Sequence, residues 1–111
     1  MKYVLDIPEI VYRDINGIKD YISTDNPGAA KKVALKIYSA IDGLVNSPFM
    51  GHELKKKFEI DTNLRCCIVK PYIVLYEIEG NIIKVYRVLD GRSNYLVRLG
   101  FISETDSDNG E

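Results

Sequence analysis

The chain has 111 residues, of which 46% are hydrophobic and 28% are charged. This length is typical of one domain, and a chain of this size builds one continuous core without disulfides or metals. The formal net charge of −1 excludes a strongly basic nucleic-acid-binding protein.

The charge is distributed unevenly along the chain. Residues 1–51 are neutral overall, whereas residues 52–101 contain nine basic and six acidic residues. The last ten residues contain four acidic residues and no basic residue. Because that segment has almost nothing to bury, we expect one domain over 1–101 and an acidic, disordered tail over 102–111. The basic excess of the second half is either an ordinary solvated surface or a face for a polyanion.

A short strand at residues 2–7 and two helices are predicted for the first half. Apolar residues recur at spacings of three and four between Val11 and Ile22, which predicts a helix ending near Ser23. Asp6 and Glu9 have the spacing of a capping box at its start.

A second helix is predicted from Pro27 to about Asn46, with Asp25 or Asn26 as its cap. Because few residues separate the two helices, we expect them to pack as an antiparallel hairpin.

The apolar period changes to two after a polar, lysine-rich connection at 49–63. Segments 64–70, 72–79 and 82–89 are rich in Ile, Val and Tyr, which predicts three consecutive strands. One helical turn at 95–99 follows the last strand. The predicted fold class is therefore α+β, in the order β-α-α-β-β-β. The helical hairpin covers one face of an antiparallel sheet, and the other face is partly open.

Several site classes find no support in the sequence. Cys66 and Cys67 are adjacent on a predicted strand and point to opposite faces, which excludes a disulfide between them. His52 is the only histidine, and no phosphate-binding glycine motif is present, so we expect neither a metal nor a cofactor. No secretory signal and no apolar run of about 20 residues occur. We therefore expect a cytoplasmic protein without membrane contact.

The end of the last strand holds the most informative residues. Arg87, Arg92 and Tyr95 lie close in sequence, and an antiparallel neighbour can bring Arg65 towards them. Guanidinium groups bind phosphate and stabilise its transition states, and a phenol can help to move a proton. We therefore predict Arg65, Arg87, Arg92 and Tyr95 as candidate catalytic residues. The alternative is structural: Arg87 pairs with Glu77 across the sheet, and Arg92 only closes its loop.

The order and spacing of several short motifs resemble the RelE/ParE superfamily of type II toxin–antitoxin toxins, over nearly the whole body of the chain. The matching segments are Asp14-Ile15, Tyr21-Ile22, Asn26-Pro27-x-Ala29-Ala30, the apolar positions Ile37, Ile41 and Leu44, Pro48-x-x-Gly51, Arg65, Tyr72-Ile73-Val74-Leu75-Tyr76 and Arg87-Val88-Leu89-x-Gly91-Arg92-x-x-Tyr95. The resemblance implies the same fold, a growth-inhibiting toxin and a cognate antitoxin that wraps it.

The resemblance leaves three functions open. RelE-like members are ribosome-dependent messenger-RNA endonucleases that use 2′-hydroxyl attack on phosphate, ParE-like members inhibit DNA gyrase without a defined catalytic site, and a decayed member only binds its antitoxin. Ile73 stands where RelE-type nucleases commonly have arginine, and Asp90 stands where many relatives have histidine. Both departures weaken the nuclease interpretation.

Four lysines are candidates for contacts to an RNA backbone: Lys55, Lys56, Lys57 and Lys70. The alternative is a solvated lysine-rich loop. We expect His52, beside Glu53, to be an exposed loop residue.

Overall fold

The computed structural model describes residues 2–103 of the chain, so the predicted acidic tail at 102–111 lies mostly outside the described residues. The elements in chain order are β1 (Val4–Asp6), α1 (Glu9–Ser23), α2 (Pro27–Gly43), β2 (His52–Glu53), α3 (Leu54–Phe58), β3 (Arg65–Val69), β4 (Tyr72–Glu79), β5 (Ile82–Asp90) and α4 (Tyr95–Arg98). The predicted α+β class and the order of the main elements are confirmed. Strand β2 and helix α3 lie within the connection for which no structure was predicted. No helix in this part of the chain is long and apolar enough to cross a membrane.

The sheet has five strands in the order β1-β5-β4-β3-β2. The meander β3-β4-β5 is antiparallel as predicted, and β2 extends it antiparallel to β3. The first strand differs, because β1 runs parallel to β5 and pairs with Ile82–Lys84 only. The chain runs from β1 through the helical hairpin and then through β2, β3 and β4 before it reaches β5, and the parallel pair β1-β5 makes the sheet mixed.

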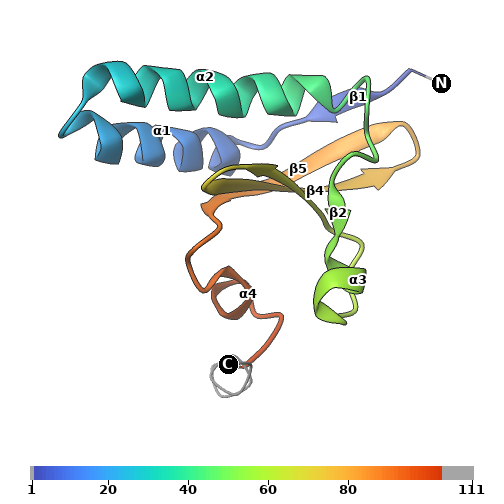
Figure 1. The fold of residues 1–111 in the computed structure, drawn as a ribbon. Coiled ribbons are helices and arrows are strands. Elements are labelled where there is room, and N and C mark those ends of the chain that lie inside the picture. The colour runs from blue at the N-terminus through green and yellow to red at the C-terminus, as the bar shows by residue number, and fades with distance from the viewer. Residues whose placement is uncertain (1, 104–111) are drawn as a thin grey trace.

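Helices α1 and α2 form the predicted antiparallel hairpin and cover one face of the sheet (Figure 1). The Asn26 side chain caps α2 by accepting a hydrogen bond from the Ala29 backbone N–H at 3.0 Å. The capping box predicted for α1 is absent, since Pro8 occupies the N-cap and no side chain there accepts a bond. The first core lies between the hairpin and the sheet, and its fully buried members include Val11, Ile15, Ile37, Val74 and Tyr76.

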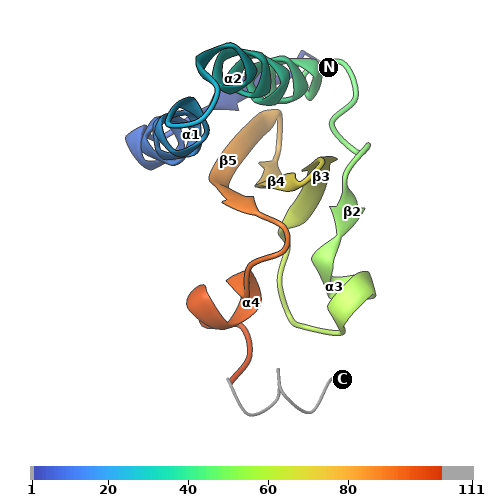
Figure 2. The ribbon, with the colours of Figure 1, turned by 60° about the vertical axis from the view of Figure 1, so that its left-hand side comes forward.

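The opposite face of the sheet carries a second core. Leu54 of α3 and Leu96 of α4 pack there against Ile73 and Leu75 of β4. Figure 2 shows that α3 and α4 lie on the side of the sheet away from the helical hairpin. The face that we expected to be partly open is therefore partly covered, and the space between these two short helices and the strands holds the candidate site.

Candidate functional site

The four predicted catalytic residues are not brought together. Arg65 lies on β3 next to Cys67, on the face of the sheet covered by the helical hairpin, since side chains alternate along a strand. One of its Nη atoms donates to the carbonyl oxygens of Phe49 at 2.9 Å and Gly51 at 2.8 Å. The side chain is only 17% exposed, and its Nη1 atom lies 3.7 Å from Oε1 of Glu53. Arg65 thus holds the loop before β2 against the sheet.

Arg87 is held by the first helix. Its Nε and Nη2 atoms donate to the two carboxylate oxygens of Asp14, both at 2.8 Å. Asp14 also accepts the backbone N–H of Val88 at 3.0 Å, on the part of the β5 edge that β1 leaves unpaired. These hydrogen bonds raise the pKa of the Arg87 guanidinium.

The alternative pairing of Arg87 with Glu77 is wrong. The register shifts between Leu75 and Tyr76, so that Leu75 faces Arg87 and Glu77 faces Lys84. Arg87 instead lines a hollow of about 600 Å³ between α1, β5 and α4. That hollow is separate from the space between α3 and α4.

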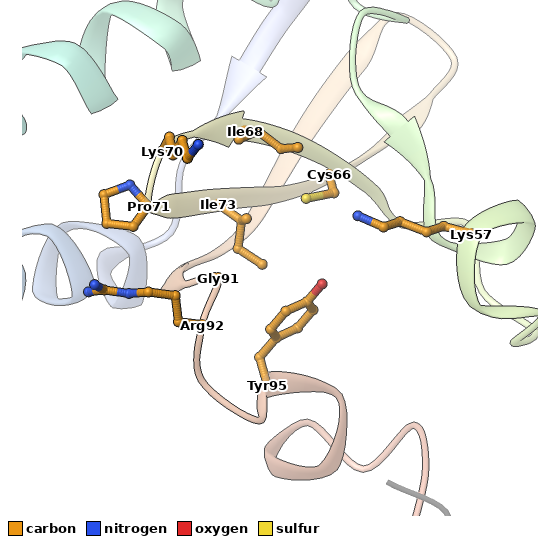
Figure 3. A pocket seen from close by; sticks show the side chains of 9 residues that line it. All are labelled: Lys57, Cys66, Ile68, Lys70, Pro71, Ile73, Gly91, Arg92 and Tyr95. Carbon is orange, nitrogen blue, oxygen red and sulfur yellow. The ribbon is translucent and has the colours of Figure 1, made fainter. Parts of the chain in front are cut away.

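Arg92 and Tyr95 do meet two of the predicted lysines around one groove, on the face of the second core. The groove has a volume of about 250 Å³ and is lined by Lys57, Cys66, Ile68, Lys70, Pro71, Ile73, Gly91, Arg92 and Tyr95. In Figure 3 the Lys57 amine and the Tyr95 hydroxyl point towards the centre of the groove, and Ile73 lies between Tyr95 and the sheet. The groove thus combines cationic groups at its rim with an apolar floor, an arrangement suited to an anionic ligand with an apolar part.

Arg92 is already paired within its own loop. Its Nε donates to Oδ1 of Asp90 at 3.0 Å, and its Nη2 donates to Oδ2 of Asp90 at 2.8 Å. The backbone N–H of Arg92 also donates to Oδ1 of Asp90, at 2.8 Å. These bonds lower the pKa of the Asp90 carboxyl and raise that of the Arg92 guanidinium. The loop is fixed further by the Gly91 N–H, which donates to the Pro71 carbonyl at 2.8 Å.

Two other lining residues keep their protons at neutral pH. Burial raises the pKa of the Cys66 thiol to about 11, and burial together with the nearby Cys66 raises the pKa of the Tyr95 phenol. None of the described residues that line the groove is a carboxylate or an imidazole. Within 2–103, no three His, Cys, Asp or Glu side chains gather as a metal site requires. The groove therefore presents cations to an anionic ligand, and the groups there that could exchange a proton are amines, a thiol and a phenol.

The remaining candidates lie outside the groove. Lys56 is exposed on α3 and pairs with Glu53 at 2.9 Å, and Lys55 lies beside Glu59 and Asp61. His52 is exposed as predicted, although it belongs to the short strand β2.

The apolar floor and the carboxylate partners of the arginines were not predicted. Asp14 lies 73 residues from Arg87, and no local pattern connects them. Asp90, by contrast, stands two residues before Arg92, which is the spacing of an Asx turn and is visible in the sequence.

Comparisons with known proteins agree with this fold. Residues 10–95 match the family model described as the ParE toxin of type II toxin–antitoxin system, parDE. The chain is 28% identical to Toxin RelE2 of Caulobacter vibrioides over 75 residues, which is 68% of this chain and 80% of the relative. It is 31% identical to Toxin ParE3 of the same organism over 93 residues, which is 81% of each protein.

Two solved structures share the fold. The chromosomal ParDE toxin–antitoxin system of P. aeruginosa has a chain that superposes with a TM-score of 0.66 at 17% identity, over 80% of this chain and 96% of that one. The toxin–antitoxin complex RelBE2 of Mycobacterium tuberculosis gives a TM-score of 0.58 at 16% identity, over 81% and 99%. The family model covers most of the two cores and the whole sheet except β1. This chain therefore belongs to the ParE toxin family of type II toxin–antitoxin systems, within the RelE/ParE superfamily.

Proposed function

We propose that this toxin arrests growth by binding its target, DNA gyrase, without cleaving RNA, and that a cognate antitoxin holds it in check. This function places the chain in the cytoplasm, where its target works. Two of the relatives reported above are named as ParE proteins or as a ParDE system, and the family model is that of ParE. These similarities favour the gyrase-binding branch of the resemblance, and the contacts of the four candidate residues favour it independently.

The observation that carries the proposal is that the three candidate arginines are bound to other protein groups and that Tyr95 is buried. Arg65 is bound to loop carbonyls, Arg87 to Asp14 and Arg92 to Asp90. Tyr95 is 92% buried and its pKa is raised. A 2′-hydroxyl attack on phosphate needs a group that removes the hydroxyl proton and a free cation that stabilises the extra negative charge. The three arginines already have partners within the protein, and the raised pKa of Tyr95 makes its phenolate harder to form.

An antitoxin partner is supported by the structural neighbours, one of which belongs to a ParDE toxin–antitoxin system and the other to the toxin–antitoxin complex RelBE2. It is also supported by the positive charge of residues 52–101, since basic residues attract an acidic segment of a partner. We expect the antitoxin to be encoded beside this chain.

Supercoiling by purified gyrase tests the proposal directly. We expect the purified chain to inhibit the reaction in a dose-dependent way and the purified antitoxin to relieve the inhibition. In parallel, expression of the chain without its antitoxin should arrest growth while the 5′ ends of messages stay unchanged. Unaffected supercoiling over a wide concentration range, or new 5′ ends that appear with the arrest, would contradict the proposal.

A ribosome-dependent messenger-RNA endonuclease is the second candidate, favoured by the groove itself. Lys57, Lys70, Arg92 and Tyr95 line one depression and suit a phosphodiester, and Lys55 and Lys56 lie along the adjoining helix α3. For this candidate, Tyr95→Phe, which removes only the hydroxyl, would abolish new 5′ ends. Growth that continues normally when the unaltered chain is expressed without its antitoxin would instead indicate a member of the family that only binds its antitoxin.

A further inference from the structure

The Asp90 carboxylate occupies the guanidinium of Arg92 within a rigid turn. It accepts from Nε, Nη2 and the backbone N–H of Arg92, at 2.8–3.0 Å. The turn cannot release the carboxylate easily, because Asp90 ends β5 opposite Tyr72, and its backbone carbonyl accepts both the Ser93 N–H and the Ser93 hydroxyl. The edge of the guanidinium formed by Nε and Nη2, which suits a bidentate contact to phosphate, is thus turned to Asp90.

We propose that Asp90 is a specificity-determining residue that withholds Arg92 from anionic ligands and so suppresses nucleic-acid binding in the groove. The inference deepens the proposed function, on which it rests, because it names the residue that makes the groove a poor site for RNA.

The competition favours Asp90 for a simple reason. A carboxylate tethered two residues away meets Arg92 at an effective concentration of about millimolar or above, whereas a phosphate of RNA must arrive by diffusion. Arg92 itself is 72% exposed, so a ligand would reach it if the carboxylate were neutral. Lys57 and Lys70 line the same groove, and a released Arg92 would add a third cation at its rim, on the side that Figure 3 shows turned away from Lys57 and Tyr95.

The test measures the binding of a fluorescein-labelled 12-nucleotide single-stranded RNA by fluorescence anisotropy. Asp90→Asn keeps an oxygen that accepts the Arg92 N–H and removes the negative charge. We expect it to bind the RNA at least 5-fold more tightly at 50 mM salt. We also expect the slope of log K against log salt to steepen by about 0.7, the value for one added phosphate contact to a single strand.

Arg92→Ala separates a specific release of Arg92 from a general change of charge. We expect this substitution to weaken RNA binding at least 5-fold in the Asp90→Asn background and less than 2-fold in the unaltered chain. Asp61→Asn removes an exposed carboxylate on the same side of the sheet, beside Ile60 of the second core, and serves as the matched control with an expected change below 2-fold.

The inference is overturned if Asp90→Asn binds RNA no more tightly, if its gain survives in Asp90→Asn/Arg92→Ala, or if Asp61→Asn gives the same gain. Asp90→Ser, whose hydroxyl can also accept the turn N–H, replaces Asp90→Asn if circular dichroism shows the latter to be unfolded. RNA cleavage by the unaltered chain would refute the proposed function alone, because the comparison between Asp90 variants measures affinity and not activity.

Discussion

At the scale of single residues, the pair formed by Asp14 and Arg87 joins helix α1 to strand β5. Their side chains are 11% and 24% exposed, and the carboxylate also satisfies the Val88 N–H. Asp14→Ala would leave a half-buried guanidinium and a backbone donor without their partner, so we expect a loss of about 2–3 kcal/mol in the free energy of unfolding. Urea denaturation followed by circular dichroism measures it. Asp20→Ala, an exposed position on the same helix, is the control, with an expected change within about 0.5 kcal/mol. Equal effects of the two substitutions would show that the pair contributes nothing.

The thiol of Cys66 predicts a loss of stability at alkaline pH. Its pKa in the folded chain is about 11 against an ordinary value of 9.0, because burial disfavours the thiolate. The contribution is thus fully present below pH 9 and is lost as the pH rises towards 11, since the unfolded chain releases this proton first. Between pH 8 and 10.5 we expect the free energy of unfolding of the unaltered chain to fall by about 1–2 kcal/mol more than that of Cys66→Ala. Urea unfolding of both proteins at the two pH values measures this difference. Tyr72 and Cys67, whose pKa values are raised by causes other than Cys66, are common to both proteins and cancel in the comparison. The part of the Tyr95 pKa shift that comes from Cys66 belongs to the difference that is measured. A pH dependence that is unchanged in Cys66→Ala would contradict the assignment.

At the scale of elements, two glycines have opposite roles. A Cβ on Gly51 would meet the Tyr76 hydroxyl at 2.6 Å and the Cys66 carbonyl at 2.9 Å, whereas a Cβ on Gly17 of α1 would meet nothing within 4 Å. Gly51→Ala must displace the loop that Tyr76 and Arg65 hold against the sheet, and we expect it to destabilise by about 1–3 kcal/mol. Gly17→Ala should stabilise by up to about 1 kcal/mol through helix propensity. Thermal unfolding of both variants tests the two expectations. Destabilisation by Gly17→Ala would contradict the helix-propensity argument, and an unchanged stability of Gly51→Ala would show that the loop makes room for the added Cβ.

Elements with a clear period were predictable from sequence, and their pairing at the edges was not. The apolar spacing between Val11 and Ile22 and the alternation after Leu64 depend on local geometry, so α1, α2 and the meander were predicted within a few residues. The parallel partner of β1 and the bulge opposite Leu75 depend on which segments meet in space, and short segments such as β2 and α3 carry too few residues to show a period. The predicted catalytic residues divide in the same way. The cations themselves were visible in the sequence, whereas the carboxylate that keeps Arg87 out of the groove comes from a distant helix.

At the scale of the whole molecule, strand β4 unites two cores on opposite faces of one sheet. Val74 and Tyr76 belong to the core under the helical hairpin, while Ile73 and Leu75 belong to the core under α3 and α4. Alternate residues of one strand thus contact both layers. The groove depends on this arrangement, because Ile73 forms its floor and the helices of the second core supply Lys57 and Tyr95.

This shared strand predicts that the two cores unfold together. Val74→Ala and Leu75→Ala remove fully buried atoms from different cores, and we expect losses of about 1–3 and 2–5 kcal/mol respectively. Neither core can lose its layer of β4 side chains without exposing the other, so each variant should keep one transition with an unchanged m-value. Circular dichroism and tyrosine fluorescence, recorded on the same urea series, should give coincident curves. Leu35→Ala, at a position on α2 that is 59% exposed, is the control and should change the midpoint little. If Leu75→Ala instead produced a second transition while the helical signal persisted, the second core would be an independently melting layer, and a partner that binds the groove would then order it.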